Sequence, residues 1–175
     1  ICRSLNNSGT RMRTPIFLSR HVFLVLIVSL VSVLGTGCSE DPALATGIDV
    51  YSKYCVTCHQ ADGAGIPGAF PTLQDTEWVN GDKGRLIRLV LRGMQGPIEV
   101  KGESFSNVMI PHDFLSDVQV AAVITFVRQG FSNNSDEVTE DEVMRVRSSL
   151  TGKGLFMASE LKFRTGIPEL EVETE

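Results

Sequence analysis

Cys55-Val56-Thr57-Cys58-His59 is the stretch of this 175-residue chain around which the rest is organised. Two cysteines three positions apart, followed at once by a histidine, form the attachment pattern of a covalently bound haem. Residues three apart share one face of a helix, so both sulfurs can form thioethers along one porphyrin edge. His59 then supplies an axial imidazole to the iron. A thioredoxin-like redox pair, half of a zinc site and a structural disulfide are the alternatives that five residues alone leave open.

The distribution of charge divides the chain near residue 38. Residues 1–37 contain four arginines and no acidic residue, whereas residues 38–175 contain 12 lysines and arginines against 21 aspartates and glutamates. An acidic body argues against binding to nucleic acid and favours redox partner proteins that present a basic surface. The body has no second CxxC and no histidine pair, and because a zinc site needs four ligands the sequence argues against zinc.

The N-terminal segment has the features of an export signal. Basic residues 11–21 precede an apolar run over residues 22–34, which at about 1.5 Å per residue is too short for a bilayer core of about 30 Å. A basic region followed by a short apolar run is typical of a secretory signal peptide. We therefore expect a signal peptide over residues 1–37 and a body exported to the periplasmic face of a bacterial membrane.

The end of this signal resembles a bacterial lipoprotein box. Small Thr36 and Gly37 precede Cys38, although Gly35 occupies the position where Leu or Val is usual. The pattern predicts that Cys38 is lipidated and anchors the protein to the membrane. The alternatives are cleavage by an ordinary signal peptidase after Ala43-Leu44-Ala45 and an uncleaved anchor.

Helix signals recur along the body. Four residues are of the types favoured as helix N-caps: Thr46, Asp82, Ser116 and Thr139. Apolar residues at helical spacing come after each of them, and Gly93 closes the second helix. The haem motif falls at the C-terminal end of the first helix. Residues 155–163 are compatible with one further short helix.

Three connecting segments complete the pattern. Residues 60–81 are rich in glycine and proline but apolar enough to line a haem crevice. Residues 98–105 alternate around a glycine and predict a small β-hairpin. Residues 107–112 form a loop with a methionine before the last core helix. The expected fold is all-α, with four or five helices around one haem and a minor hairpin.

Residues 46–130 resemble a class I cytochrome c. Gly47 and Tyr51 are similar to the family's glycine–aromatic pair, which lets the first helix cross the last one closely. Residues 70–73 (FPTL) resemble its proline loop, and this implies that the Pro71 carbonyl accepts the Nδ1 proton of His59. Residues 78–131 are similar to cytochrome c subunits of bacterial quinoprotein dehydrogenases, oxidases and nitrite reductases.

The sequence features and the resemblance together predict a domain division. Polar residues 38–45 are expected to form a tether, residues 46–150 a cytochrome c domain with one covalent haem c, and residues 151–175, where the helix signals weaken, a C-terminal extension. Because the haem supplies much of the core, we expect the haem-free chain to be poorly folded.

The resemblance implies Met109 as the sixth iron ligand, because the family holds its axial methionine in this loop. Here Ile110 separates the methionine from the proline that usually follows it directly. Met94, whose simpler role is packing, and His112, expected at the surface, are the alternative ligands.

Other residues carry less information. Trp78 either reaches a haem propionate through its indole N–H or packs in the core. Tyr51 and Tyr54 are expected in the core of the first helix. The three arginines at helical spacing in the second helix are expected to form a solvated face: Arg85, Arg88 and Arg92. Contact with haem propionates or with an acidic partner is the alternative.

These features predict a monohaem electron carrier rather than an enzyme. It would exchange one electron between Fe(II) and Fe(III), with His59 and Met109 as ligands, in a respiratory or periplasmic redox chain. One alternative is an electron-transfer subunit of a larger dehydrogenase, oxidase or reductase complex. The other is a haem enzyme or sensor with an open sixth position.

Overall fold

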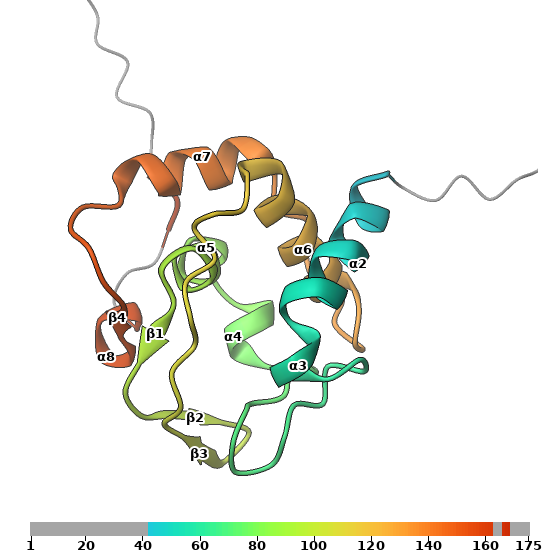
Figure 1. Ribbon diagram of the computed structural model, residues 1–175, viewed down its shortest axis with the longest axis vertical. Helices are drawn as coiled ribbons and strands as arrows, with labels where there is room; N and C mark the ends of the chain where they lie inside the picture. The colour runs from blue at the N-terminus through green and yellow to red at the C-terminus, as the bar shows by residue number, and fades with distance from the viewer. Residues whose placement is uncertain (1–41, 163–165, 169–175) are drawn as a thin grey trace, which may run out of the picture. The chain divides into compact units, whose positions relative to one another are not determined.

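The computed structural model describes residues 42–162 and 166–168 of the chain (Figure 1). The predicted signal peptide and Cys38 lie outside the described residues. Within these residues the chain forms seven helices, three of them four residues long, and four short strands. This is the expected fold class, a mostly helical domain with minor β-structure. No helix in this part of the chain is long and apolar enough to cross a membrane.

The first described helix, α2 (Pro42–Tyr54), begins four residues before the predicted start at Thr46. It therefore includes part of the segment that was expected to be a tether. Proline is favoured at the first position of a helix because its fixed φ suits the helix and its missing N–H would have no partner there. A single turn, α3 (Val56–His59), follows at once and carries the haem motif.

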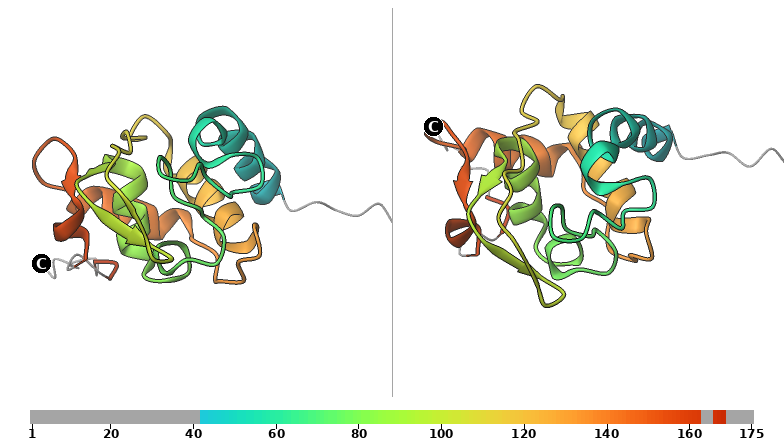
Figure 2. Two further views of the ribbon diagram at one scale, coloured as in Figure 1. Left: turned by 90° about the horizontal axis from the view of Figure 1, so that it is seen from below. Right: turned by 60° about the horizontal axis from the view of Figure 1, so that its bottom comes forward.

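Helix α2 crosses helix α6 (Asp117–Gln129), and the two lie side by side in Figures 1 and 2. A Cβ atom added to Gly47 would overlap the carbonyl oxygen of Ala122 and would lie 2.8 Å from Cβ of Phe126. Only glycine permits backbones to approach this closely. The close helix crossing expected at Gly47 is therefore confirmed.

The predicted caps of the later helices are confirmed. Helix α5 (Lys83–Arg92) begins where the Asp82 carboxylate accepts a hydrogen bond from the backbone N–H of Arg85 at 2.7 Å, and it ends at Gly93, with φ of 65°. Capping boxes at Ser116 and Thr139 begin α6 and α7 (Glu140–Ser149). A single-turn helix capped by Thr76, α4 (Glu77–Asn80), was not predicted.

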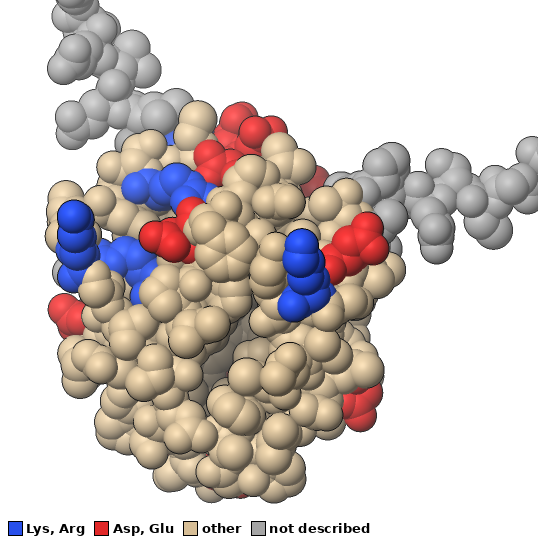
Figure 3. Space-filling view, in the orientation of Figure 1, with Lys and Arg blue, Asp and Glu red and all other residues tan. Residues whose placement is uncertain are grey.

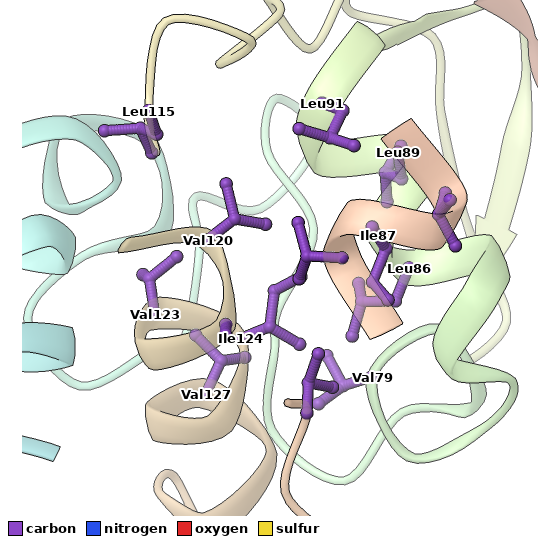
Figure 4. Close-up of a cluster of buried hydrophobic side chains, with 14 of the residues drawn as sticks. Val79, Leu86, Ile87, Leu89, Leu91, Leu115, Val120, Val123, Ile124 and Val127 are labelled. Atoms are coloured by element: carbon purple, nitrogen blue, oxygen red, sulfur yellow. The ribbon is translucent and has the colours of Figure 1, made fainter. Parts of the chain in front are cut away.

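The core lies where α5, α6 and α7 meet (Figure 4). The apolar stripe of α6 points towards the side chains of α5, and it consists of Val120, Val123, Ile124 and Val127. From α5 it meets Leu86, Ile87, Leu89 and Leu91. Val143 and Val146 of α7 are fully buried against the same core. The stripe predicted for α6 from its spacing is the one that is buried. On α5, Leu86 and Leu89 are buried as predicted, whereas Val90 is only partly buried and the fully buried Ile87 and Leu91 were not predicted.

Two small strand pairs lie outside this core. Strands β2 (Ile98–Val100) and β3 (Glu103–Phe105) form the predicted antiparallel hairpin. Lys101 and Gly102 both have positive φ, at 52° and 79°, as a tight two-residue hairpin turn requires. Strand β1 (Met94–Gln95) pairs in parallel with β4 (Phe156–Met157), which is followed by the single turn α8 (Ala158–Leu161). This second pairing was not predicted.

The arginines of α5 do not form a solvated face, so that prediction was wrong. Arg85 and Arg88 are only 7% and 8% exposed. Arg85 lies against Trp78 and Glu77, whereas Arg88 donates a hydrogen bond to the carbonyl of Gly166 at 2.9 Å. A guanidinium can be buried in this way because its stem packs against apolar groups while its N–H groups reach carbonyl oxygens.

Candidate haem site

A cavity of about 330 Å³ opens between α3, α5 and the loop before α6. It is lined mainly by apolar side chains from residues 51–127, and none of the residues lining it is Asp, Glu, Lys or Arg. Figure 3 shows the corresponding hollow near the centre of one face, bordered mostly by uncharged residues. Such a lining suits a large, flat and apolar group.

The two cysteines of the motif line this cavity as free thiols. Cys55 lies at the junction of α2 and α3, where its N–H donates to the carbonyl of Tyr51 at 2.9 Å. The N–H groups of Cys58 and His59 both donate to the carbonyl of Cys55, at 3.2 Å and 3.0 Å, so the motif is one continuous helical turn. Burial, together with the neighbouring Cys58, raises the pKa of Cys55 to about 11, so this sulfur is a protonated thiol before attachment.

The imidazole of His59 is oriented by the proline loop. Its Nδ1 lies 3.1 Å from the carbonyl oxygen of Pro71 and donates to it, where the resemblance placed this bond. Since Nδ1 is used, Nε2 is the nitrogen left to bind a metal. Burial lowers the pKa of His59, although the bond to Pro71 opposes this shift, so the ring is held in the neutral form that iron requires.

Comparison with known proteins agrees with this geometry. Residues 44–131 match the family model described as Cytochrome c. The chain belongs to the cytochrome c family. It binds haem c covalently, because Cys55 and Cys58 occupy the attachment positions of a CxxCH motif and both line the cavity.

Some relatives of this cytochrome are named as cytochromes and others as subunits of larger enzymes. It is 36% identical over 115 residues to a cytochrome c-552 of Thermus thermophilus, covering 61% of this chain and 77% of that one. It is 31% identical over 107 residues to the cytochrome c subunit of the quinone alcohol dehydrogenase of Gluconobacter oxydans, covering 59% and 22%. Subunit CcoP of the cbb3-type cytochrome c oxidase of Rhodobacter capsulatus is 30% identical over 111 residues, covering 59% and 37%.

Met109 lines the same cavity as His59. Its backbone exchanges two hydrogen bonds with Met94, since each N–H donates to the other's carbonyl at 3.0 Å. A Cβ on Gly93 would overlap the Met109 carbonyl oxygen, so the loop lies directly on the end of α5. Ile110, which interrupts the usual Met-Pro pair, is 63% exposed and leaves this arrangement intact. Met94 also lines the cavity but is almost completely buried, at 4% exposed.

His112 is not at the surface, contrary to the sequence-based expectation. It is 6% exposed, its backbone N–H donates to the carbonyl of Val90 at 3.0 Å, and its ring contacts the rings of Tyr54 and Phe114, which also contact each other. Its ring also lines the cavity, and its Nδ1 atom has no hydrogen-bond partner within the described structure. Burial lowers the pKa of His112, although nearby backbone carbonyls and Asp113 act in the opposite direction.

Trp78 lines the cavity from α4. The guanidinium of Arg85 lies over the indole, with its central carbon 4.8 Å from the ring centre. Arg85 is fixed there by hydrogen bonds to the side chain and carbonyl of Glu77, at 3.1 Å and 2.8 Å. Trp78 therefore meets both the cavity and a buried cation, and each of its two expected roles remains compatible with its place.

Two buried polar residues that orient the cavity wall were missed from the sequence. Asn133 accepts a hydrogen bond from the N–H of Asp75 and donates to the carbonyls of Leu73 and Val127, so it joins the proline loop to α6. Arg128 is 3% exposed, and its guanidinium donates to the carbonyls of three separate residues: Val79, Gly81 and Asp136. Asn133 stands in a polar loop and Arg128 in the last turn of the apolar helix α6, so only their three-dimensional contacts reveal the role.

The described residues offer no second metal site. No group of three or more His, Cys, Asp and Glu side chains in this part of the chain is arranged to hold a metal ion.

Proposed function

We propose that this cytochrome is a monohaem electron carrier whose iron is bound by His59 and Met109. The bound haem supplies the chemistry, a one-electron exchange between Fe(II) and Fe(III). The observation that carries the proposal is that His59 and Met109 line one cavity, each held by a backbone partner of its own: Pro71 for His59 and Met94 for Met109.

The chain's contribution is to fix the ligands and exclude water. The Pro71 carbonyl keeps the Nδ1 proton on His59 and makes Nε2 the more basic ligand. As an iron ligand, the thioether of Met109 would stabilise Fe(II) and compete with water or other small ligands, which suits outer-sphere electron transfer. The cavity wall excludes charged side chains, and Pro71 and Trp78 complete it on the side of the proline loop and α4.

Replacement of Met109 tests the ligand assignment. Met109→Ala is expected to lose the far-red sulfur-to-iron absorption band, to lower the reduction potential and to let the reduced protein bind carbon monoxide rapidly. Met94→Leu is the matched control, because it replaces the other methionine of the cavity by a residue of similar volume. A Met109→Ala protein that keeps the band and the potential would defeat the assignment.

A place in a respiratory or periplasmic redox chain belongs to the same proposal. It is supported by the basic and apolar N-terminal segment and by Cys38, whose lipidation would tether the domain to the outer face of a membrane. In this scheme residues 1–37 are removed, residues 46–150 carry the haem and residues 151–175 form an extension. Mass spectrometry of the mature protein tests it, and an unmodified N-terminus beyond Cys38 would exclude the lipid anchor.

A second candidate is an electron-transfer subunit of a larger complex. It is favoured by relatives that are cytochrome c subunits of a quinone alcohol dehydrogenase and of a cbb3-type oxidase. Purification from the native membrane under mild conditions distinguishes the two. A free carrier elutes alone, whereas a subunit elutes with a dehydrogenase, oxidase or reductase in constant proportion.

A further inference from the structure

The backbone that carries Met109 belongs to a small three-part arrangement. Met109 and Met94 exchange two hydrogen bonds, so the methionine loop lies along one edge of β1. The other edge of β1 pairs with β4, in the register Met94 with Phe156 and Gln95 with Met157. Strand β1 therefore lies between the proposed axial ligand and a segment that follows the last core helix by several residues.

Strand β4 is held firmly against the end of α5. The N–H of Phe156 donates to the carbonyl of Gly93 at 3.2 Å, and its side chain is only 4% exposed. The Arg92 guanidinium lies 4.6 Å from the centre of the Phe156 ring. Arg92 also donates to the carbonyls of Thr151 and Gly154 at 2.8–2.9 Å. These contacts join β4 to the last turn of α5 through both backbone and side chain.

The same segment reaches the start of α5. Leu161 of α8 is completely buried, and the N–H of Gly166 donates to the second carboxylate oxygen of Asp82, the α5 cap, at 2.9 Å. A Cβ on Gly84 would overlap the carbonyl oxygen of Gly166. Residues 151–162 and 166–168, called here the C-terminal segment, thus contact α5 from its first turn to its last. All of them lie beyond residue 131, where the family match ends.

We propose that the C-terminal segment is a positioning element for Met109. Strand β4 fixes β1, and β1 in turn fixes the methionine backbone through Met94. Phe156 and Arg92 are the positioning residues. Phe156 is buried in β4, beside β1, and Arg92 binds the C-terminal segment to the last turn of α5. The inference rests on the proposed ligation by His59 and Met109. It assigns to this extension a function in the redox site, although none of its described residues lines the cavity.

Competition by an added ligand measures how easily Met109 leaves the iron. Imidazole binds the oxidised holoprotein only when the sixth position opens, so its apparent affinity reports the population of the open state. We expect Phe156→Ala to raise this affinity about tenfold, within the range by which residues outside a site commonly change it. The far-red sulfur-to-iron band should weaken in parallel, and Phe156→Leu should restore both readouts towards the wild-type values.

Two further variants separate positioning from general destabilisation. Val146→Ala removes a fully buried side chain of α7 that belongs to the same core but lies outside β1 and β4. It should lower the thermal midpoint while leaving imidazole affinity unchanged. Arg92→Met keeps an apolar stem and removes only the contacts of the guanidinium with the C-terminal segment. We expect it to raise the imidazole affinity by a smaller factor than Phe156→Ala, and it takes the place of that variant if Phe156→Ala does not fold.

The proposal is overturned by wild-type imidazole affinity in the folded Phe156 and Arg92 variants. It is equally overturned if Val146→Ala raises the affinity as much as they do. Met109→Ala distinguishes this failure from failure of the ligand assignment. If that variant loses the far-red band and the potential falls, the assignment stands and only the positioning role is lost. If the band and potential persist, the assignment itself is wrong.

Discussion

Substitution of Gly47 by alanine sets two opposing effects against each other. Gly47 lies inside α2, where alanine is favoured over glycine by about 0.5–1 kcal/mol through helix propensity alone. A methyl group at this position, however, would overlap the carbonyl oxygen of Ala122 and approach Cβ of Phe126. Neither atom is the end of a flexible side chain, so the two helices must move apart.

The packing effect should outweigh the propensity effect. Forcing an extra methyl group into a close contact costs about 1–3 kcal/mol. The middle of that range, less the propensity gain, leaves a net loss of about 1 kcal/mol in the free energy of unfolding. For a domain of this size that corresponds to a thermal midpoint lower by roughly 3–6 °C. Gly47→Val should lose more, because its larger side chain forces a wider separation.

Unfolding of the holoprotein is conveniently followed by fluorescence. Trp78 is the single tryptophan of the chain and lines the cavity, so the haem quenches it until unfolding separates the two. Ser52→Ala is the matched control, since Ser52 is exposed on the same helix and its change should stay within about 0.5 kcal/mol. A Gly47→Ala protein as stable as the wild type, or more stable, would refute the close crossing of α2 and α6.

Three other predictions concern buried polar groups. Asn133→Ala removes three hydrogen bonds between the proline loop, Asp75 and α6. We expect the free energy of unfolding, measured with denaturant, to fall by about 2–4 kcal/mol. A fall of less than about 0.5 kcal/mol would contradict this role of Asn133. Arg128→Lys should cost a similar amount, because one ammonium cannot replace a guanidinium that donates to three carbonyls, and wild-type stability would disprove this role. Burial lowers the pKa of His112 below its ordinary value of 6.5, so the unfolded chain takes up a proton first as the pH falls and stability is lost below about pH 6.5. His112→Phe should therefore lose less stability than the wild type between pH 7 and pH 5, and equal losses would exclude the effect.

The features that the sequence predicted depend on residues close together in the chain. A cap needs a side chain and an N–H three residues later, and a hairpin turn needs two residues with positive φ. Asp82, Ser116, Thr139 and the turn at Lys101 meet these conditions locally. The haem motif is likewise five consecutive residues. These elements were predictable because no distant partner decides them.

Most of the missed features depend on distant partners; helix α4, which is capped locally by Thr76, is the exception. Strand β1 has two residues, too few for any periodicity, and it exists because β4 lies beside it about 60 positions later. The burial of His112 involves the carbonyl of Val90 and the ring of Tyr54, which lie 22 and 58 positions earlier in the chain. Asn133 stands in a loop rich in polar residues, and nothing local distinguishes it from its exposed neighbours. Spacing identifies which residues repeat along a helix face, but not what covers that face.

Helix α5 shows why the domain needs the C-terminal segment, which covers the side of this helix that faces away from the cavity. Leu86, Leu89 and Val90 line the haem cavity, so this face must stay free of charge. The arginines on its other faces bring cations into the same helix, and Arg85 and Arg88 are buried there. Carbonyl oxygens of Glu77 and Gly166 accept their N–H groups, which allows burial without a charged side chain entering the cavity.

This separation of charge has a consequence for the redox centre. Oxidation adds one positive charge to the iron, and an apolar wall without nearby carboxylates stabilises that charge poorly. The uncharged lining therefore favours Fe(II), in the same direction as a methionine ligand. The C-terminal segment supports the uncharged lining, because its carbonyls accept hydrogen bonds from Arg88 and Arg92 away from the cavity. It supports the proposed methionine ligand, because β4 pairs with β1, which holds the backbone of Met109. A chain that ended after α7 would keep the haem motif and both proposed ligands. It would lack the contacts by which the C-terminal segment holds α5 and, through β1, the backbone of Met109.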